Sequence, residues 1–453
     1  MEDRTALNRR DFLRTSAAVS GVSLTGAQRV MGANDRVRVA VCGVRKRGWD
    51  HVRQFAKLPN VEVAALCEVD ESVTAGRLRD MEKLKLPKPS TYWDVRNLLD
   101  DKSIDAVSIA TPTSWHALIA IWACQAGKDV YVEKPCSHNW WEGRQLIRAS
   151  RRYRRVIQHG TQSRSRQSAV EAMQKLHEGV IGELYLARGL CYKRRNTIGQ
   201  TPIAAVPAGV HYDMWLGPAP LHPFTKNRFH YNWHWFWDYG NGDLGNQGIH
   251  QVDVARWGLG VKFPNKVSAM GGHFLFDDDQ QTPNTMTCAF EFDLPGGKKK
   301  MIEFGVRHWI TNREAEIGTA HMYSQGQGNN TIGDIFYGSN GYLAIGDEDV
   351  LNGYRAYVGP EMQPGPTGHA GGDHFANFID VVRSRKMEQL HAPIEEGHIS
   401  CTLVHLANAS YRLGRTLHFN PETEEVIGDE EANRMLRDAD RGYRHPFTIP
   451  EDV

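Results

Sequence analysis

The sequence predicts an α/β protein with a doubly wound parallel sheet in its N-terminal part and an α+β domain with antiparallel strands in its C-terminal part. Short apolar runs alternate with helical segments from residue 37 to about residue 135, as in a parallel sheet covered by helices on both faces. Beyond about residue 160 this pattern lapses. The segments 285–293 and 300–306 then alternate apolar and polar residues, which is typical of antiparallel strands. A chain of 453 residues also exceeds one ordinary core, so we expect two domains.

The first residues are predicted to be a leader. Arg9 and Arg10 precede a weakly apolar stretch from Thr15 to Ala27, which resembles a twin-arginine export signal. This stretch is too short and too polar to anchor the chain in a bilayer. We assign residues 1–33 to the leader and expect a protein that folds in the cytoplasm and is exported to the periplasm. A frayed basic N-terminus is the alternative.

The first predicted strand, residues 37–43, leads into a glycine turn and then into a helix that begins near residue 49. Such a turn lets backbone amides at a helix N-terminus approach a pyrophosphate. Gly43 and Gly48 take the first and third positions of a GxGxxG pattern, but Arg45 replaces the middle glycine. The turn is therefore weak support by itself. Its candidate cofactor-binding residues are Gly43, Val44, Arg45 and Gly48.

Two further strands are predicted to end at the same edge of the sheet. The strand 61–67 ends on Glu68, where a carboxylate accepts hydrogen bonds from ribose hydroxyls and repels a 2′-phosphate, which favours NAD over NADP. The strand 106–110 is followed by four candidate residues: Thr111, Pro112, Trp115 and His116. Because parallel sheets bind ligands at the carboxyl ends of their strands, these residues are predicted to line one site.

The next predicted strand begins at Asp129 and ends on Glu133, Lys134 and Pro135. The proline forces the chain out of the strand, and Glu133 and Lys134 are expected to face the crevice where a dinucleotide lies, as candidate cofactor-binding residues. A solvated lysine at a strand end is the simpler interpretation of this motif alone. Its position downstream of the glycine turn and Glu68 favours a functional lysine.

In their order and spacing, these motifs resemble those of the glucose-fructose oxidoreductase, inositol dehydrogenase and rhizopine catabolism (Gfo/Idh/MocA) family. The similarity continues through residues 160–162 and 240–250. It implies a nicotinamide-binding Rossmann domain, which we place at residues 35–158, and a C-terminal domain at residues 159–453. In this family the second domain has a large, mostly antiparallel open sheet that walls the substrate cleft and often forms an oligomer interface. The resemblance therefore also implies a homo-oligomer.

The resemblance assigns roles to several residues. It implies NAD as the cofactor, tightly bound in some relatives, with Gln162 among its contacts, and it makes Lys134 the residue that transfers a proton. Burial and the positive nicotinamide would both lower the pKa of this lysine. The Asp-x-x-x-His segment of the family is here Asn246 to His250, predicted to share one face of a helix. Since Asn246 cannot take a proton, Lys134 and His250 are the predicted catalytic residues.

The segment 228–239 is unusually rich in aromatic residues. Ring faces next to polar groups suit a sugar, whose C–H face stacks while its hydroxyls form hydrogen bonds. We take four residues of this region as candidate substrate contacts: Arg228, His230, Asp238 and Asn246. Core packing is the alternative. A metal bound by His230 and His234 would lack a third ligand, so no metal is expected.

The tail is predicted to be helical scaffold. Residues 374–385 and 397–415 have apolar residues at helical spacing. The charged stretch 422–441 is predicted to be a further surface helix.

The composition of the chain excludes some classes of binding partner. A formal net charge of +1 gives no electrostatic basis for binding nucleic acid or an anionic membrane, so we expect a small-molecule carbohydrate partner. The seven cysteines form no CxxC pair and have no regular spacing, so neither a disulfide framework nor a zinc ribbon is predicted. They are expected to be small core residues.

Three functions remain open. The first is an NAD-dependent oxidoreductase that transfers hydride between a secondary carbinol of a sugar, polyol or glycoside and the nicotinamide. The second is a redox-neutral glycosidase or lyase with tightly bound NAD, in which oxidation acidifies a neighbouring C–H, so that elimination cleaves the glycosidic bond. Export favours the second function, or an oxidation with internal recycling of the cofactor, because free NAD is not expected outside the cytoplasm. A non-catalytic nucleotide-binding protein is the third, supported only by Arg45 and Asn246.

Overall fold

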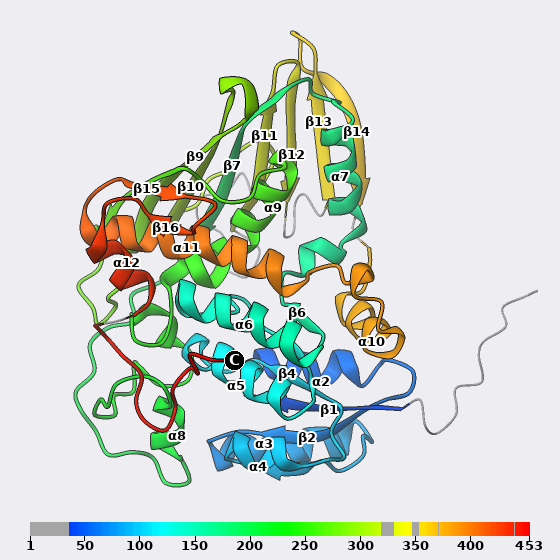
Figure 1. Ribbon diagram of the computed structural model, residues 1–453, viewed down its shortest axis with the longest axis vertical. Helices are drawn as coiled ribbons and strands as arrows, with labels where there is room; N and C mark the ends of the chain where they lie inside the picture. The colour runs from blue at the N-terminus through cyan, green and yellow to red at the C-terminus, as the bar shows by residue number, and fades with distance from the viewer. Residues whose placement is uncertain (1–35, 319–329, 347–352, 370, 439) are drawn as a thin grey trace, which may run out of the picture. The chain divides into compact units, whose positions relative to one another are not determined.

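The computed structural model describes residues 36–318, 330–346, 353–369, 371–438 and 440–453 (Figure 1). The segment Val37–Val453 forms one compact unit. The predicted leader, residues 1–33, lies outside the described residues. Within the described part of the chain, no helix is long and apolar enough to cross a membrane.

The N-terminal sheet has six strands in the order β3-β2-β1-β4-β5-β6 (Figure 1). Every pairing in it is parallel, which confirms the predicted doubly wound sheet. Its strands are β1 (Val37–Cys42), β2 (Val61–Cys67), β3 (Ser90–Tyr92), β4 (Ala106–Ile109), β5 (Asp129–Val132) and β6 (Ile157–His159). The helices that connect them are α2 (Arg47–Phe55), α3 (Glu71–Lys83), α4 (Val95–Asp100), α5 (Thr113–Gln125) and α6 (Trp140–Tyr153).

Alternate residues of the central strands pack against opposite layers of helices. Val39 and Val41 of β1 belong to one hydrophobic cluster with residues of α2 and α3. Ala40 and Cys42 belong to the other cluster, with residues of α4, α5 and α6. A strand buried on both faces needs this near-continuous apolar sequence.

One helix of this core comes from far along the chain. In α10 (His374–Ser384), Phe375 stacks on Tyr131 of β5 with ring centroids 4.8 Å apart, and Phe378 joins the same cluster. The side chain of Asp373 caps the helix by accepting hydrogen bonds from the amides of Phe375 and Ala376. Residues of the predicted C-terminal domain therefore complete the core of the N-terminal sheet. The predicted boundary near residue 158 stays a prediction.

The second sheet has ten strands in the order β14-β13-β12-β11-β7-β10-β9-β8-β15-β16 (Figure 1). All pairings are antiparallel except that of β7 with β10, so the predicted large, mostly antiparallel sheet is confirmed. Its strands are β7 (Leu184–Lys193), β8 (Lys266–Gly272), β9 (Thr285–Asp293), β10 (Lys299–His308), β11 (Thr331–Gly338), β12 (Gly341–Gly346), β13 (Gly353–Val358), β14 (Gln363–His369), β15 (Leu417–Asn420) and β16 (Glu425–Val426).

The second half also contains the helices α7 (Gln167–His177), α8 (Tyr212–Leu216), α9 (Ile249–Leu259), α11 (Ile394–Leu413) and α12 (Glu430–Leu436). Of these, α9 and α11 lie between the ten-stranded sheet and the N-terminal half (Figure 1). α9 contacts β7 and β11, while α11 contacts both α6 and β8 (Figure 1). Because α11 touches elements of both halves, it is buried along most of its length.

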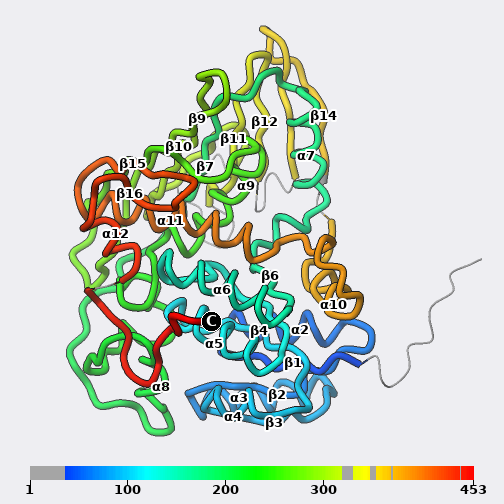
Figure 2. Tube along the Cα trace, in the orientation of Figure 1, coloured from blue at the N-terminus to red at the C-terminus, as the bar shows by residue number. Residues whose placement is uncertain are grey.

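The end of the chain differs from the prediction. The described residues of the stretch 422–441 contain the short strand β16 and seven helical residues, in α12. Gly428, with a φ of +65°, turns the chain between them. The last residues then return to the N-terminal half (Figure 2), where Gln145 of α6 donates a hydrogen bond to the carbonyl of Glu451.

Candidate active site

The glycine turn after β1 is closed by two residues that tolerate no side chain. Gly43 has a φ of +77°, and a Cβ on it would lie 2.7 Å from the carbonyl oxygen of Ala110. A Cβ on Gly48 would lie 1.8 Å from the carbonyl oxygen of Gly43. These close approaches fit a dinucleotide, because such a turn brings the backbone at the start of α2 up to a pyrophosphate.

Glu68 connects this turn to the end of β2. Its Oε2 accepts a hydrogen bond from the amide of Val44 at 2.9 Å, and its Oε1 accepts from the amides of Val69 and Asp70 at 2.9 and 3.2 Å. Burial raises the pKa of this carboxyl, and the three amide donors oppose the rise. The carboxylate has acceptor capacity left for ribose hydroxyls.

A cavity of about 330 Å³ lies at the carboxyl ends of β1, β2, β4 and β5. It brings together many of the predicted residues: Gly43, Arg45, Glu68, Thr111, Pro112, Trp115, His116, Glu133, Lys134, His230 and Asn246. Its opposite side comes from the aromatic segment, through Tyr231, Trp233 and His234. The strand ends and the aromatic segment therefore enclose one space, as expected for a sheet of this type.

Lys134 reaches across this cavity. Its Nζ donates a hydrogen bond to the carbonyl oxygen of Asn246 at 2.5 Å and lies 3.5 Å from the Oδ1 of the same residue. Burial lowers the pKa of the Lys134 ammonium to about 8; Glu133 raises it, and the positive charge of Arg47 lowers it further. The side chain can therefore exist as a neutral amine close to neutral pH.

Glu133 is held as a carboxylate. Its Oε1 accepts hydrogen bonds from the Nε of Arg47 at 2.8 Å and from the Nε2 of His51 at 3.0 Å. Gln162, predicted to contact the cofactor, donates to the same oxygen at 3.2 Å. Burial would raise the pKa of Glu133, but the Arg47 charge and the His51 hydrogen bond hold it well below its usual range.

His51 is neutral and its tautomer follows from its partners. A carboxylate can only accept, so the Nε2 of His51 donates to Glu133 and its Nδ1 accepts from the hydroxyl of Ser108 at 2.8 Å. Burial lowers the pKa of this imidazole. Sequence reasoning missed Arg47 and His51. Their positions could have indicated that they lie near the site, because Arg47 belongs to the predicted turn and His51 to the helix that follows it.

Asn246 is fixed by a buried acid that the sequence analysis also missed. Asp243 accepts two hydrogen bonds from Arg195, at 2.7 and 2.9 Å, and one from the Nε2 of His308 at 2.9 Å. The Nδ2 of Asn246 donates to the same carboxylate at 3.1 Å. Burial disfavours this charge, but Arg195 and His308 hold the pKa of Asp243 well below its usual range.

The segment that contains Asn246 is not the regular helix that was predicted. Residues Leu244–Gly248 form a π-helical turn, and α9 begins only at Ile249. Asn246 lines the cavity, whereas His250, on the first turn of α9, is not among the lining residues. A wider turn changes the angle between consecutive side chains, so the spacing rule for a regular helix does not apply here.

Arg228 and Asp238 lie in the packing of the aromatic segment. Arg228 stacks on Phe236 and donates to the carbonyl of Pro223 at 2.9 Å, while Asp238 accepts from the Nε2 of His222 at 2.7 Å. Neither residue lines the cavity, and nor do Val44, Gly48 and Gln162. His230 does line it, 2.8 Å from Asp70. The predicted roles of Arg228 and Asp238 in substrate binding stay predictions.

Comparison with known protein families agrees with this site. Residues 37–161 match the family model described as an oxidoreductase family with an NAD-binding Rossmann fold. Residues 188–285 and 341–448 match the C-terminal alpha/beta domain of the same family. The chain belongs to the Gfo/Idh/MocA oxidoreductase family. The predicted family, and NAD as its cofactor, are confirmed.

Two curated relatives of this Gfo/Idh/MocA chain are named as glycosidases. The alpha-N-acetylgalactosaminidase of Shewanella oneidensis is 29% identical over 204 residues, which cover 39% of this chain and 44% of the relative. A glycosyl hydrolase family 109 protein of Shewanella pealeana is 32% identical over 202 residues, with the same coverage. The chain spans less than half the length of these relatives.

Solved structures with the same fold cover more of the chain. The aldose-aldose oxidoreductase of Caulobacter crescentus, complexed with glycerol, has a TM-score of 0.62 at 17% identity and covers 85% of this chain and 100% of its own. A levoglucosan dehydrogenase, in complex with NADH and L-sorbose, has a TM-score of 0.62 at 17% identity, with coverages of 84% and 98%. At these identities the likeness is one of fold.

Proposed function

We propose that this protein oxidises a secondary carbinol of a sugar, polyol or glycoside, with hydride passing to NAD. The observation that carries the proposal is Lys134: an amine with a pKa of about 8 lies in the same cavity as the glycine turn and Glu68. A group that titrates near neutral pH, placed where parallel sheets bind dinucleotides, is what proton transfer during carbinol oxidation requires.

The side chains in and around the cavity have separate roles in the proposed reaction. The nicotinamide, when bound, supplies the hydride acceptor. The Nζ of Lys134, as the neutral amine, takes the proton of the carbinol hydroxyl, and the Asn246 carbonyl holds that nitrogen in place. Glu133 stays ionised and anchors Arg47 and His51, so it does not compete for the proton. Asp243 is likewise held as a carboxylate and positions Asn246.

The opposite wall supports a carbohydrate substrate. The aromatic side chains of Tyr231 and Trp233 line the cavity, and Asn246 and His234 add polar groups to the same lining. The Nδ1 of His234 donates to the carbonyl of Tyr231, 2.5 Å away, which leaves Nε2 as the acceptor. Burial lowers the pKa of His234 to about 3, so this imidazole is a neutral hydrogen-bonding partner for a hydroxyl.

Redox-neutral cleavage of a glycoside is the second candidate, favoured by the names of the curated relatives. Both functions begin with the same carbinol oxidation. In the second, the ketone acidifies a neighbouring C–H, loss of that proton expels the aglycone and leaves an enone, water adds to the enone, and the hydride returns to the ketone at the end. A non-catalytic role is disfavoured by Lys134 and its lowered pKa.

One experiment separates these functions. The purified full chain is incubated with NAD and a panel of free sugars, polyols and nitrophenyl glycosides, and both NADH and released aglycone are measured. Net NADH without cleavage supports the oxidoreductase. Aglycone release without net NADH supports the redox-neutral glycosidase. Neither signal on any member of the panel, with NAD bound, would contradict both.

We also propose export by the twin-arginine route, supported by Arg9 and Arg10 in the N-terminal sequence. An exported enzyme of this kind would be served best by tightly bound NAD, which the redox-neutral route would recycle. Self-association through the ten-stranded sheet is proposed on the family resemblance alone.

A further inference from the structure

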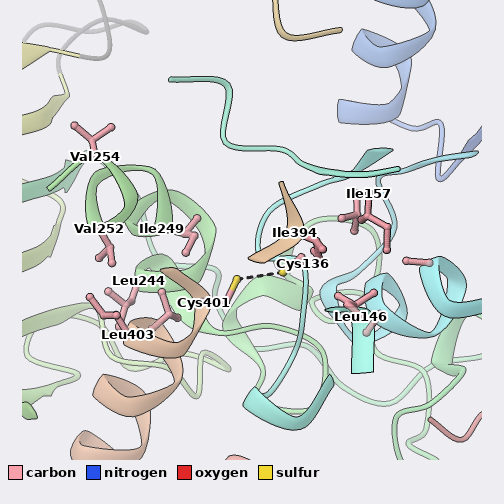
Figure 3. Close-up of a cluster of buried hydrophobic side chains, with 14 of the residues drawn as sticks. Cys136, Leu146, Ile157, Leu244, Ile249, Val252, Val254, Ile394, Cys401 and Leu403 are labelled. Atoms are coloured by element: carbon pink, nitrogen blue, oxygen red, sulfur yellow. Dashed lines mark hydrogen bonds between the residues drawn. The ribbon is translucent and has the colours of Figure 1, made fainter. Parts of the chain in front are cut away.

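Three side chains with metal-binding chemistry meet in the core, close to Lys134. Cys136 lies two residues beyond Lys134, His159 ends β6, and Cys401 lies on α11. Their ligand atoms all lie within 4.8 Å of one another, and all three residues are fully buried. Figure 3 shows the two sulfur atoms pointing toward one another across the space between α11 and the loop after β5. The residues are too far apart in sequence to form a recognisable motif.

We propose that Cys136, His159 and Cys401 bind one zinc ion. The two Sγ atoms are 3.6 Å apart. Two thiolates at about 2.3 Å from a zinc ion, separated by a tetrahedral angle, lie about 3.8 Å apart, whereas a disulfide brings the sulfurs to about 2.05 Å. Ordinary contact between two thiols gives a similar spacing, so the sulfurs alone do not decide between the two.

The surroundings of His159 favour a bound metal ion over a simple contact between two thiols. His159 is completely buried, and among the described residues its Nε2 has no hydrogen-bond partner. Its Nδ1 lies 3.4 Å from the hydroxyl of Thr161. Buried polar atoms almost always have a partner, and leaving one unpaired costs about 1–3 kcal/mol. A ligand nitrogen of this ring lies within 4.8 Å of both sulfur atoms, and the ring interacts with the Cys401 thiol, so a single metal ion could be bound by the imidazole and both thiolates together.

The surroundings select a divalent ion. Leu146, Ile157 and Ile394 lie around the thiol pair (Figure 3), and a net charge in such an apolar core is costly. Two thiolates and a neutral imidazole cancel the charge of Zn²⁺ completely. With a monovalent soft cation such as Cu⁺ the same ligands would carry a net negative charge. The ion would join the loop that holds Lys134 to β6 and α11, a structural role that does not depend on the proposed reaction.

The test is metal content, which needs neither NAD nor substrate. The reduced full chain is dialysed against Zn²⁺ and then against metal-free buffer, and bound zinc is measured by elemental analysis. We expect about one zinc ion per chain, and a loss of about tenfold or more in Cys136→Ser and Cys401→Ser. Cys288→Ser is the matched control, because Cys288 is also a fully buried thiol but lies on β9. It should keep the zinc.

A second measurement covers variants that fail to fold. The wild-type chain is loaded with Co²⁺, and a thiolate-to-cobalt charge-transfer absorption is expected. Three results would overturn the proposal: no zinc above background in the wild type, a cobalt spectrum without thiolate bands, or equal loss of zinc in Cys288→Ser. A Cys136–Cys401 disulfide in protein isolated without reductant would also overturn it. None of these results bears on carbohydrate oxidation.

Discussion

Glu133 and Lys134 are neighbours in the sequence, yet their surroundings favour different protonation behaviour. Arg47 and His51 hold Glu133 as a carboxylate, while burial lowers the pKa of Lys134 to about 8. The motif and its position predicted that Lys134 would be functional. Sequence could not predict that Glu133 would accept hydrogen bonds from His51 and Arg47, which are 82 and 86 positions away, because a residue's partners across a fold depend on packing.

The first prediction is the pH dependence of oxidation. Because the neutral amine of Lys134 accepts the proton, kcat/KM should rise with pH up to about 8 and level off above it. Below that value the rate should fall about tenfold per pH unit as the ammonium forms. Steady-state kinetics in overlapping buffers would measure the profile. A profile that is flat from pH 6 to pH 9 would contradict this role.

The second prediction concerns cofactor choice. Glu68→Ala should weaken NAD relative to NADP by about tenfold, since the change removes a charged acceptor for the ribose and the repulsion of a 2′-phosphate. Glu62→Ala is the matched control: Glu62 lies on the same strand but pairs with Arg38, 2.8 Å away, outside the cavity. Titration of both cofactors decides. An unchanged preference in Glu68→Ala would mean that this carboxylate does not reach the ribose.

At the scale of elements, local sequence patterns predicted the strands well. They did not predict the conformation of the segment that contains Asn246. The strands 61–67 and 285–293 have the predicted bounds, because apolar alternation and flanking turns are local signals. The π-helical turn at Leu244–Gly248 is not visible in the pattern. The turn follows Asp243 directly, and the carboxylate of Asp243 accepts hydrogen bonds from Arg195 and His308. These partners are distant in the sequence, so a local pattern does not reveal them.

A third prediction tests how three elements are joined. Asp253 of α9 accepts two hydrogen bonds from Arg164, of the short helix Gln162–Ser165, and one from Ser400 of α11. Asp253→Asn removes the fully buried carboxylate that pairs with Arg164 and leaves Glu396, 3.1 Å from the Nη2 of Arg164, as the remaining acidic partner. The free energy of unfolding should therefore fall by about 3 kcal/mol. Glu395→Gln is the control, because Glu395 pairs with Arg151 at the surface. Its effect in urea denaturation should stay below about 1 kcal/mol.

The lowered pKa of Asp253 also predicts that the stability of the protein depends on pH. Burial opposes the charge of Asp253, but Arg164 holds its pKa down to about 2, from an ordinary value of 3.8. A depressed folded-state pKa stabilises the fold above the unfolded value, so this contribution is complete above about pH 4 and is lost as pH falls toward 2. Wild type should lose stability over that range more steeply than Asp253→Asn. Equal slopes in acid denaturation would contradict the assignment.

At the scale of the whole molecule, segments distant in sequence complete each half. α10 fills the core of the N-terminal sheet, α11 contacts both halves, and the final residues return to α6 (Figures 1 and 2). Sequence predicted two sheets and their kinds. The sequence could not predict where these segments pack, because the pattern of an amphipathic helix does not indicate which sheet the helix will cover.

A further prediction at this scale concerns export. Changing Arg9 and Arg10 together to lysine should leave the folded protein in the cytoplasm, with NAD bound. Fractionation of cells that express the full chain would show it, with Arg4→Lys as a control outside the paired arginines. Undiminished export of the double variant would remove the argument for a retained cofactor.

The most direct test of the central claim, that Lys134 transfers the proton during carbinol oxidation, is the reduction of NAD by substrate in Lys134→Met. The methionine keeps much of the apolar stem and removes the amine. NAD should bind as in the wild type, while the rate of NAD reduction should fall by about a hundredfold or more. In a redox-neutral enzyme, glycoside cleavage should fall with it. Wild-type rates of reduction in Lys134→Met would contradict the account.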